Sequence, residues 1–472
     1  MTYRRTLSGW LVLCVLAIAP TTSVIGQEPE TLQVTIHPQA FPRPTLKYQL
    51  LPEFKDRVRG NAAVYYGKVT AEHLGFFGNM KLREKIDEWN AASLSDLLKP
   101  DVEMNSASIE KMLRMAARCE SCDWQLPVRE EEFYTMGLPE VQQLRQFARI
   151  LLARMRIQIA HGKFDAAIET LQSALAIGKN AAEGETIVNG LVGVAIDSVM
   201  AKQILELIQQ PGAPNLYWAL STLPRPLIDL RKGAEAEMSA LELSFPVIRN
   251  LRAERTPEEW EAMHSKFWRQ VVELVPFMEV GNGVQVKDLK VESLVAESFL
   301  HAPAGRQRLL DQGIDPVVVS AMPNAQVALI EAVRAYEIDR DNLFRWFLVP
   351  YDDGLQPGET LQHQADQEKD RRSKQGKLSQ IFLPNLYPAR RASAQLDRSI
   401  AVLRAIEALR MYAATHDGKL PAKLSEIVGA PVPVDPMTGK PIEYELRGEV
   451  GLIRVTPLTE RTHTYEIHVA KP

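Results

Sequence analysis

The chain has 472 residues, of which 46% are hydrophobic and 24% are charged, a composition typical of globular proteins. Its formal net charge of −4 provides no positive field that would attract nucleic acid or an anionic membrane, so we expect neither as a partner. The length allows two or three domains with a sizeable hydrophobic core.

Residues 1–26 have the features of a secretory signal peptide. Arg4 and Arg5 form a positive n-region, an apolar run follows from Leu11 to Ala19, and small residues lead to Gly26. We predict export to the periplasm or the extracellular space, with cleavage after Gly26. The apolar run is shorter than the roughly 20 residues that cross a bilayer. We therefore expect no stable membrane span once the signal is removed.

Residues 27–79 begin with a proline-rich stretch, which predicts an extended N-terminal arm. Residues 80–349 carry helical periodicity along almost their whole length, which predicts a helical body. The clearest pair of helices lies at 140–178, where one apolar face ends at Gly162 and the next begins at Phe164. This spacing predicts an antiparallel helical hairpin.

Part of this hairpin, IAHGKFDAAIETLQSALAI, resembles a tetratricopeptide repeat. It has the glycine, aromatic and small residues of that family in the same order, at Gly162, Phe164, Ala167 and Ala174. No second clear copy follows, although arrays of such repeats need about three for stability. The resemblance therefore implies stacked helical hairpins more than a true repeat domain. Later in the body, Thr256-Pro257-Glu258-Glu259 has the pattern of a helix start with a reciprocal capping box.

Residues 350–391 are rich in turn-forming and polar residues, and we predict a polar linker. Residues 392–472 then combine a long amphipathic helix with three alternating stretches, PIEYEL, GLIRVTPL and HTYEIHVA. The expected fold is therefore mostly α, with stacked helical hairpins followed by a small α+β domain. This domain would contain the long helix and a three-stranded antiparallel sheet.

The C-terminal region resembles the soluble domain of type II secretion pseudopilins. The resemblance lies in ALRMYAATHDGKLP, in Asp435-Pro436 and in Gly439-Lys440-Pro441. It implies the small α+β fold of that family. LYPARRASAQ precedes the helix where the family has an apolar membrane anchor, so the resemblance implies a shared fold and not pilus-type assembly. With its signal and helical body, the chain resembles a class of exported bacterial helical proteins.

The segment RCESCDW contains Cys119 and Cys122, the two cysteines that remain after removal of the signal peptide. Export favours their oxidation. A helix is expected to end close to Cys119, which places the unfavourable end of its dipole beside the thiol. Positions three apart on a helical turn are close enough for a disulfide bond. We predict a structural disulfide between Cys119 and Cys122, and a redox pair, half of a metal site and two reduced thiols remain as alternatives.

Other candidate motifs are incomplete. Ser108-Ile109-Glu110-Lys111 matches the Ser-x-x-Lys pattern of penicillin-recognising enzymes, but the sequence has no Lys-Thr-Gly partner. A zinc site would need two further ligands beside the cysteine pair. We therefore assign no catalytic residue, cofactor or metal, and the sequence favours a non-enzymatic role while leaving an enzyme open. The leading hypothesis is an exported helical scaffold that presents a protein-interaction surface to a protein partner. The alternatives are an envelope thiol oxidoreductase that uses Cys119 and Cys122, and an accessory component of a secretion-type apparatus.

Overall fold

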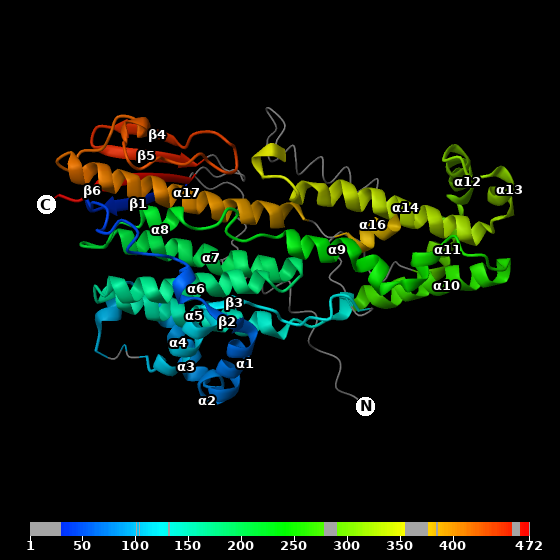
Figure 1. Ribbon diagram of the computed structural model, residues 1–472, viewed down its shortest axis with the longest axis horizontal. Helices are drawn as coiled ribbons and strands as arrows, with labels where there is room; N and C mark the ends of the chain where they lie inside the picture. Colours follow the sequence, from blue (N-terminus) through cyan, green and yellow to red (C-terminus); the bar gives the residue numbers. More distant parts are fainter. Residues whose placement is uncertain are drawn as a thin grey trace.

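The structure is a computed structural model that describes residues 30–100, 102, 104–130, 133–277, 290–354, 376–383, 386–455 and 463–471. Over these residues the chain is mostly helical with a small mixed β-sheet, which confirms the predicted class in its main feature. Figure 1 shows the sheet at one end of the elongated molecule and helices α10–α13 at the other. The predicted signal peptide, and residues 355–375, 384 and 385 of the predicted linker, lie outside the described residues.

Three long helices form the centre of the molecule: α5 (Pro139–Ala160), α6 (Phe164–Ala182) and α7 (Ile187–Ile208). Helix α6 packs against both α5 and α7. Gly162, in the turn between α5 and α6, has a φ of 66°, a left-handed conformation that glycine adopts without strain. A Cβ atom on Gly193 would collide with the carbonyl oxygen of Gly178, so these two glycines allow α6 and α7 to approach closely.

The other helices surround these three. Helix α10 begins with the predicted capping box, because Thr256 Oγ1 accepts from Glu259 N and the Glu259 side chain accepts from Thr256 N. The remaining α-helices with described bounds are α1 (Ala62–Glu72), α2 (Leu74–Phe77), α3 (Met80–Ala91), α4 (Ala107–Ala117), α8 (Tyr217–Ser221), α9 (Arg231–Ser244), α10 (Pro257–Leu274), α11 (Val291–Phe299), α12 (Ala302–Asp311), α13 (Pro316–Ala321), α14 (Asn324–Phe344), α16 (Lys377–Phe382) and α17 (Tyr387–Thr415).

The larger sheet has four strands in the order β1-β6-β5-β4. Strands β4 (Glu443–Arg447), β5 (Val450–Val455) and β6 (His463–Val469) pair antiparallel, and β1 (Glu30–Ile36) adds to β6 in parallel. The sheet is therefore mixed, where we had expected three antiparallel strands. The fourth strand comes from the predicted extended arm. It forms because Val34 and Ile36 alternate with polar residues and are completely buried.

The range 27–79 differs from an extended arm in a second respect. Besides β1 it contains strand β2 (Val58–Asn61) and helices α1 and α2. Strand β2 pairs in parallel with the short strand β3 (Cys119–Ser121) to form a separate two-stranded sheet. The N-terminal residues thus join both sheets of the described structure.

The segment 392–472, predicted as a separate domain, shares its hydrophobic core with the helical body. Helix α17 packs along α7 and α8, as Figure 1 shows for α7. Completely buried Arg410 and Glu407 on α17 form an ion pair of 2.8 Å, and Arg410 also donates to the carbonyl oxygen of Ala213 at 2.8 Å. Among the described helices, none has the length and apolar character needed to cross a bilayer.

Candidate functional site

The predicted helical turn through Cys119 and Cys122 does not form. Helix α4 ends at Ala117, and the next residues leave the helix to form β3 beside β2. Two contacts of Arg118 fix this change of direction. Its Nε donates to the carbonyl oxygen of Asp56 at 2.6 Å, and its carbonyl oxygen accepts from Val58 N at 2.9 Å.

The extended path explains why the predicted disulfide is absent from the structure. An extended chain rises about 3.3 Å per residue, so positions three apart are separated by roughly 10 Å, beyond the ~7 Å that a disulfide allows between Cα atoms. Cys119 and Cys122 are both free thiols. The prediction assumed a continuous helix, on which the same two positions would be one turn apart, whereas α4 ends at Ala117.

The surroundings of the two thiols do not activate them. Burial raises the pKa of both Cys119 and Cys122, and the negative charge of Glu183 raises the pKa of Cys122 further. Cys119 Sγ lies 3.4 Å from the carbonyl oxygen of Met115, to which it donates. A reactive cysteine requires the opposite, a lowered pKa that populates the thiolate. Nor does the described part of the chain bring together three His, Cys, Asp or Glu side chains in a way that could hold a metal ion.

A cleft with a volume of about 610 Å³ lies beside this segment. Its walls come from four places in the sequence: residues 51–57, the segment 117–129, the C-terminal half of α6 with the loop after it, and the first turn of α9. Among the described residues of these walls, acidic and basic side chains are equally represented: Glu120, Asp123, Glu183 and Glu185, with Arg57, Arg129, Lys179 and Lys232.

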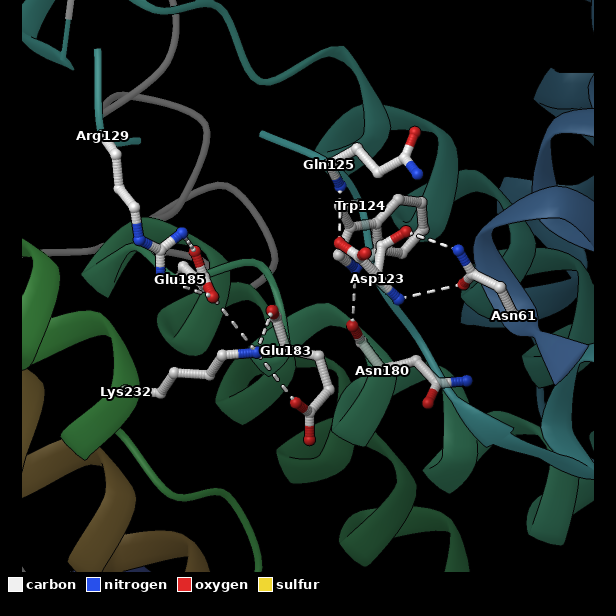
Figure 2. Close-up of polar contacts among 9 residues, drawn as sticks. All are labelled: Asn61, Asp123, Trp124, Gln125, Arg129, Asn180, Glu183, Glu185 and Lys232. Atoms are coloured by element: carbon white, nitrogen blue, oxygen red, sulfur yellow. Dashed lines mark hydrogen bonds and ion pairs between the residues drawn. The ribbon is translucent and has the colours of Figure 1, made fainter. Parts of the chain in front are cut away.

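Asn61 fixes one side of the cleft. As the N-cap of α1 it accepts from Ala63 N at 3.0 Å, and its side chain also bonds both backbone polar groups of Asp123. Asp123 in turn accepts from Gln125 N at 2.9 Å, and Gln125 has a left-handed φ of 51°. Figure 2 shows the Asn61 side chain bonded to the backbone of Asp123 in the turn after β3. The conformation of the turn is therefore set by side-chain contacts from two separate segments.

Trp124 anchors the same turn to α6. Its indole Nε1 donates to the carbonyl oxygen of Asn180 at 2.8 Å, and its ring stacks on Tyr66 with centroids 5.6 Å apart. The side chain of Asn180 donates to the Tyr66 hydroxyl at 2.9 Å. Trp124 thus connects α1, α6 and the segment after β3 in one wall of the cleft, and Figure 2 shows its hydrogen bond to Asn180.

The opposite wall is held by ion pairs around the loop between α6 and α7. Arg129 contacts Glu185 at 3.0 Å, and Lys232 contacts Glu183 at 3.2 Å. Lys232 also donates to the carbonyl oxygen of Glu183 at 2.9 Å. These contacts, drawn in Figure 2, bring two acidic and two basic groups together along one side of the cleft.

The cysteine motif therefore lies in a wall of the cleft, although its thiols are not activated. Asn61 and Asn180, which shape the cleft, carry no sequence signal of a binding site because their role depends on contacts between distant segments. In the other candidate motif, Ser108 is exposed on α4 and its hydroxyl lies 3.3 Å from His73 Nε2.

A comparison with protein families, with curated proteins and with solved structures finds no match to this chain.

Proposed function

We propose that the chain is an exported, non-enzymatic helical scaffold whose cleft beside Cys119–Gln125 binds an extended segment of a partner polypeptide. The observation that carries the proposal is the equal number of acidic and basic side chains among the described residues of the cleft walls. A nucleic acid or a small anion would require a positive excess, and a divalent cation would require an acidic one. A polypeptide is the ligand that offers groups of both signs together with main-chain donors and acceptors.

Strand β3 supports an extended conformation for this ligand. Within the described residues β3 pairs only with β2, and Glu120 and Ser121 of β3 line the cleft. A peptide that adds to an exposed strand edge gains main-chain hydrogen bonds, while its alternate side chains reach specific pockets. We infer that the bound segment lies along β3.

An aromatic side chain beside the cleft offers an apolar anchor. Phe54 is 84% exposed, and its neighbours Pro52 and Arg57 line the cleft. Large exposed aromatic side chains are enriched at protein interfaces, where they contribute most to affinity. Phe54 would therefore contact an apolar residue of the partner at the edge of the charged cleft.

The thiol oxidoreductase is the weaker alternative, because the raised pKa values of Cys119 and Cys122 oppose thiolate formation. A role in a secretion-type apparatus rests on the resemblance of residues 392–472 alone.

The test is the selection of peptides from a random library on the full mature chain, followed by affinity measurements by fluorescence anisotropy. Arg129→Glu reverses a charge on the cleft wall, and Lys81→Glu is the matched reversal on exposed α3. We expect Arg129→Glu to weaken the selected peptides about fivefold or more, and Lys81→Glu to leave them unchanged. Peptides that bind equally well to both variants would place the interaction elsewhere and contradict the proposal.

A further inference from the structure

A second cavity lies in the half of the molecule far from the cleft, among α10, α11, α12, α14 and α16. Its volume is about 360 Å³, within the range of cavities that bind small molecules. Its lining includes the apolar side chains of Trp268, Leu294 and Leu378. It also includes two arginines, Arg308 and Arg334.

A buried carboxylate holds the two arginines in place. Glu331 is 3% exposed and accepts from Arg308 Nε at 2.8 Å and from Arg334 Nε at 3.3 Å. A Cβ atom on Gly305 would collide with Glu331 Cγ, so the glycine provides the space in which Glu331 lies against α12. The carboxylate is therefore positioned by the backbone of one helix and orients arginines from two helices.

Among the described residues that line the cavity, the charges do not cancel. One carboxylate neutralises one guanidinium group, and Glu331 is shared by two. Lys377 adds a third basic group to the lining, while Glu297 adds only a second acidic one. Arg308 and Arg334 also keep side-chain exposures of 39% and 31%, so the ion pairs do not enclose them completely.

We propose that this cavity binds a small amphiphilic carboxylate. Its carboxylate would accept hydrogen bonds from Arg308 and Arg334, since the planar guanidinium group matches the geometry of a carboxylate. Its apolar body would lie against Trp268, Leu294 and Leu378. This inference does not depend on the peptide-binding cleft, because the two sites share no residue.

Isothermal titration of the full mature chain with hexanoate tests the proposal, with hexanol and inorganic phosphate as the other probes. We expect saturable binding of hexanoate that weakens with added salt, and weaker binding of the two other probes. Hexanol lacks the charge and phosphate lacks the apolar body. Absence of saturable hexanoate binding, or equal binding of either other probe, would overturn the proposal.

Three substitutions locate the binding. Arg334→Gln should weaken hexanoate about tenfold or more, because it removes a charge-assisted hydrogen bond while Arg308 still pairs with Glu331. Glu331→Gln should tighten binding, because both arginines lose their competing carboxylate. Arg269→Gln, on the exposed face of α10, is the control and should change nothing. An unchanged affinity in both Arg334→Gln and Glu331→Gln would overturn the assignment to this cavity.

Discussion

The side chain of Asn61 bonds the backbone of Asp123 at both polar groups: Asn61 Nδ2 donates to Asp123 O at 2.7 Å, and Asn61 Oδ1 accepts from Asp123 N at 2.9 Å. The same Oδ1 caps the N-terminus of α1. One amide therefore joins the start of a helix to the turn that forms the cleft wall, although 61 residues lie between the two positions. This arrangement makes Asn61 a direct test of the cleft.

Asn61→Ala removes both the cap and the two contacts with Asp123. We expect a loss of about 2 kcal/mol in the free energy of unfolding, of which the cap accounts for about 1 kcal/mol. The affinity for selected peptides should fall as well, because the turn after β3 loses its support. Urea unfolding and fluorescence anisotropy measure the two effects.

Asn79→Ala is the matched control, since Asn79 caps α3 by accepting from Leu82 N at 3.1 Å and does not line the cleft. It should cost only the ~1 kcal/mol of a cap and leave peptide affinity unchanged. Equal effects of both substitutions on stability and on affinity would show that the contacts between Asn61 and Asp123 do not support the site.

The sequence was most informative where structure depends on neighbouring residues. The apolar faces on either side of Gly162 predicted helices α5 and α6, Thr256 predicted the start of α10, and the alternating residues of HTYEIHVA predicted strand β6. Each of these signals is local, because helix periodicity, capping and strand alternation repeat within a few residues.

The features that the sequence did not predict depend on distant partners. Strand β1 pairs with β6, which lies more than 400 residues later in the chain. Cys119 follows a helix, but the pairing of β2 with β3 draws the chain into an extended path. The same holds for Trp124, whose role depends on a carbonyl group of α6. Tertiary contacts of this kind override local propensity.

The thiols provide a prediction about reactivity. Because burial raises the pKa of both cysteines, each should be almost entirely protonated at pH 8. We expect iodoacetamide to modify both more slowly than free cysteine, with Cys122, which is 6% exposed, slower than Cys119. Mass spectrometry of Cys119→Ser and Cys122→Ser separates the two rates. If the modification rate of either thiol stopped rising with pH below pH 8, that cysteine would be activated. This result would favour the thiol oxidoreductase over the scaffold.

Asp197 on α7 provides a prediction about pH. It is completely buried, neither carboxylate oxygen has a hydrogen-bond partner among the described residues, and burial raises its pKa well above the usual 3.8. The folded state therefore binds this proton more tightly than the unfolded state. The contribution of the protonated group is fully present below about pH 4 and is lost as the pH rises through the folded-state pKa.

Asp197→Asn removes this titration with almost no change in volume. As the pH rises from 4 to 8, the unfolding free energy of the wild type should fall relative to that of the variant. The relative change should be at least about 1.4 kcal/mol, which corresponds to a single unit of pKa shift. Urea unfolding across that range measures the difference. Asp165→Asn is the control: a hydrogen bond from Tyr48 lowers the pKa of Asp165, so its contribution is instead lost as the pH falls. Parallel stability curves for the wild type and Asp197→Asn would contradict the prediction.

The buried pair on α17 tests whether the C-terminal region and the helical body unfold together. Glu407 Oε1 accepts from Leu216 N at 2.9 Å, and Arg410 donates to the carbonyl oxygens of His37 and Ala213. From its place on α17, the pair therefore contacts both the loop that follows β1 and the segment that follows α7. Arg410→Met leaves the Glu407 carboxylate buried without its counter-charge and should cost about 3–5 kcal/mol.

Unfolding in urea, followed by circular dichroism and by tryptophan fluorescence, measures this loss. The surface pair of Arg447 and Glu445 on β4 is the control, and Arg447→Met should change stability by less than about 1 kcal/mol. Because the core is shared, the two probes should give coincident transitions in wild type and in Arg410→Met. Separate transitions in the wild type would mean that residues 392–472 fold independently. A small loss of stability in Arg410→Met would mean that Glu407 becomes protonated or hydrated once its partner is lost.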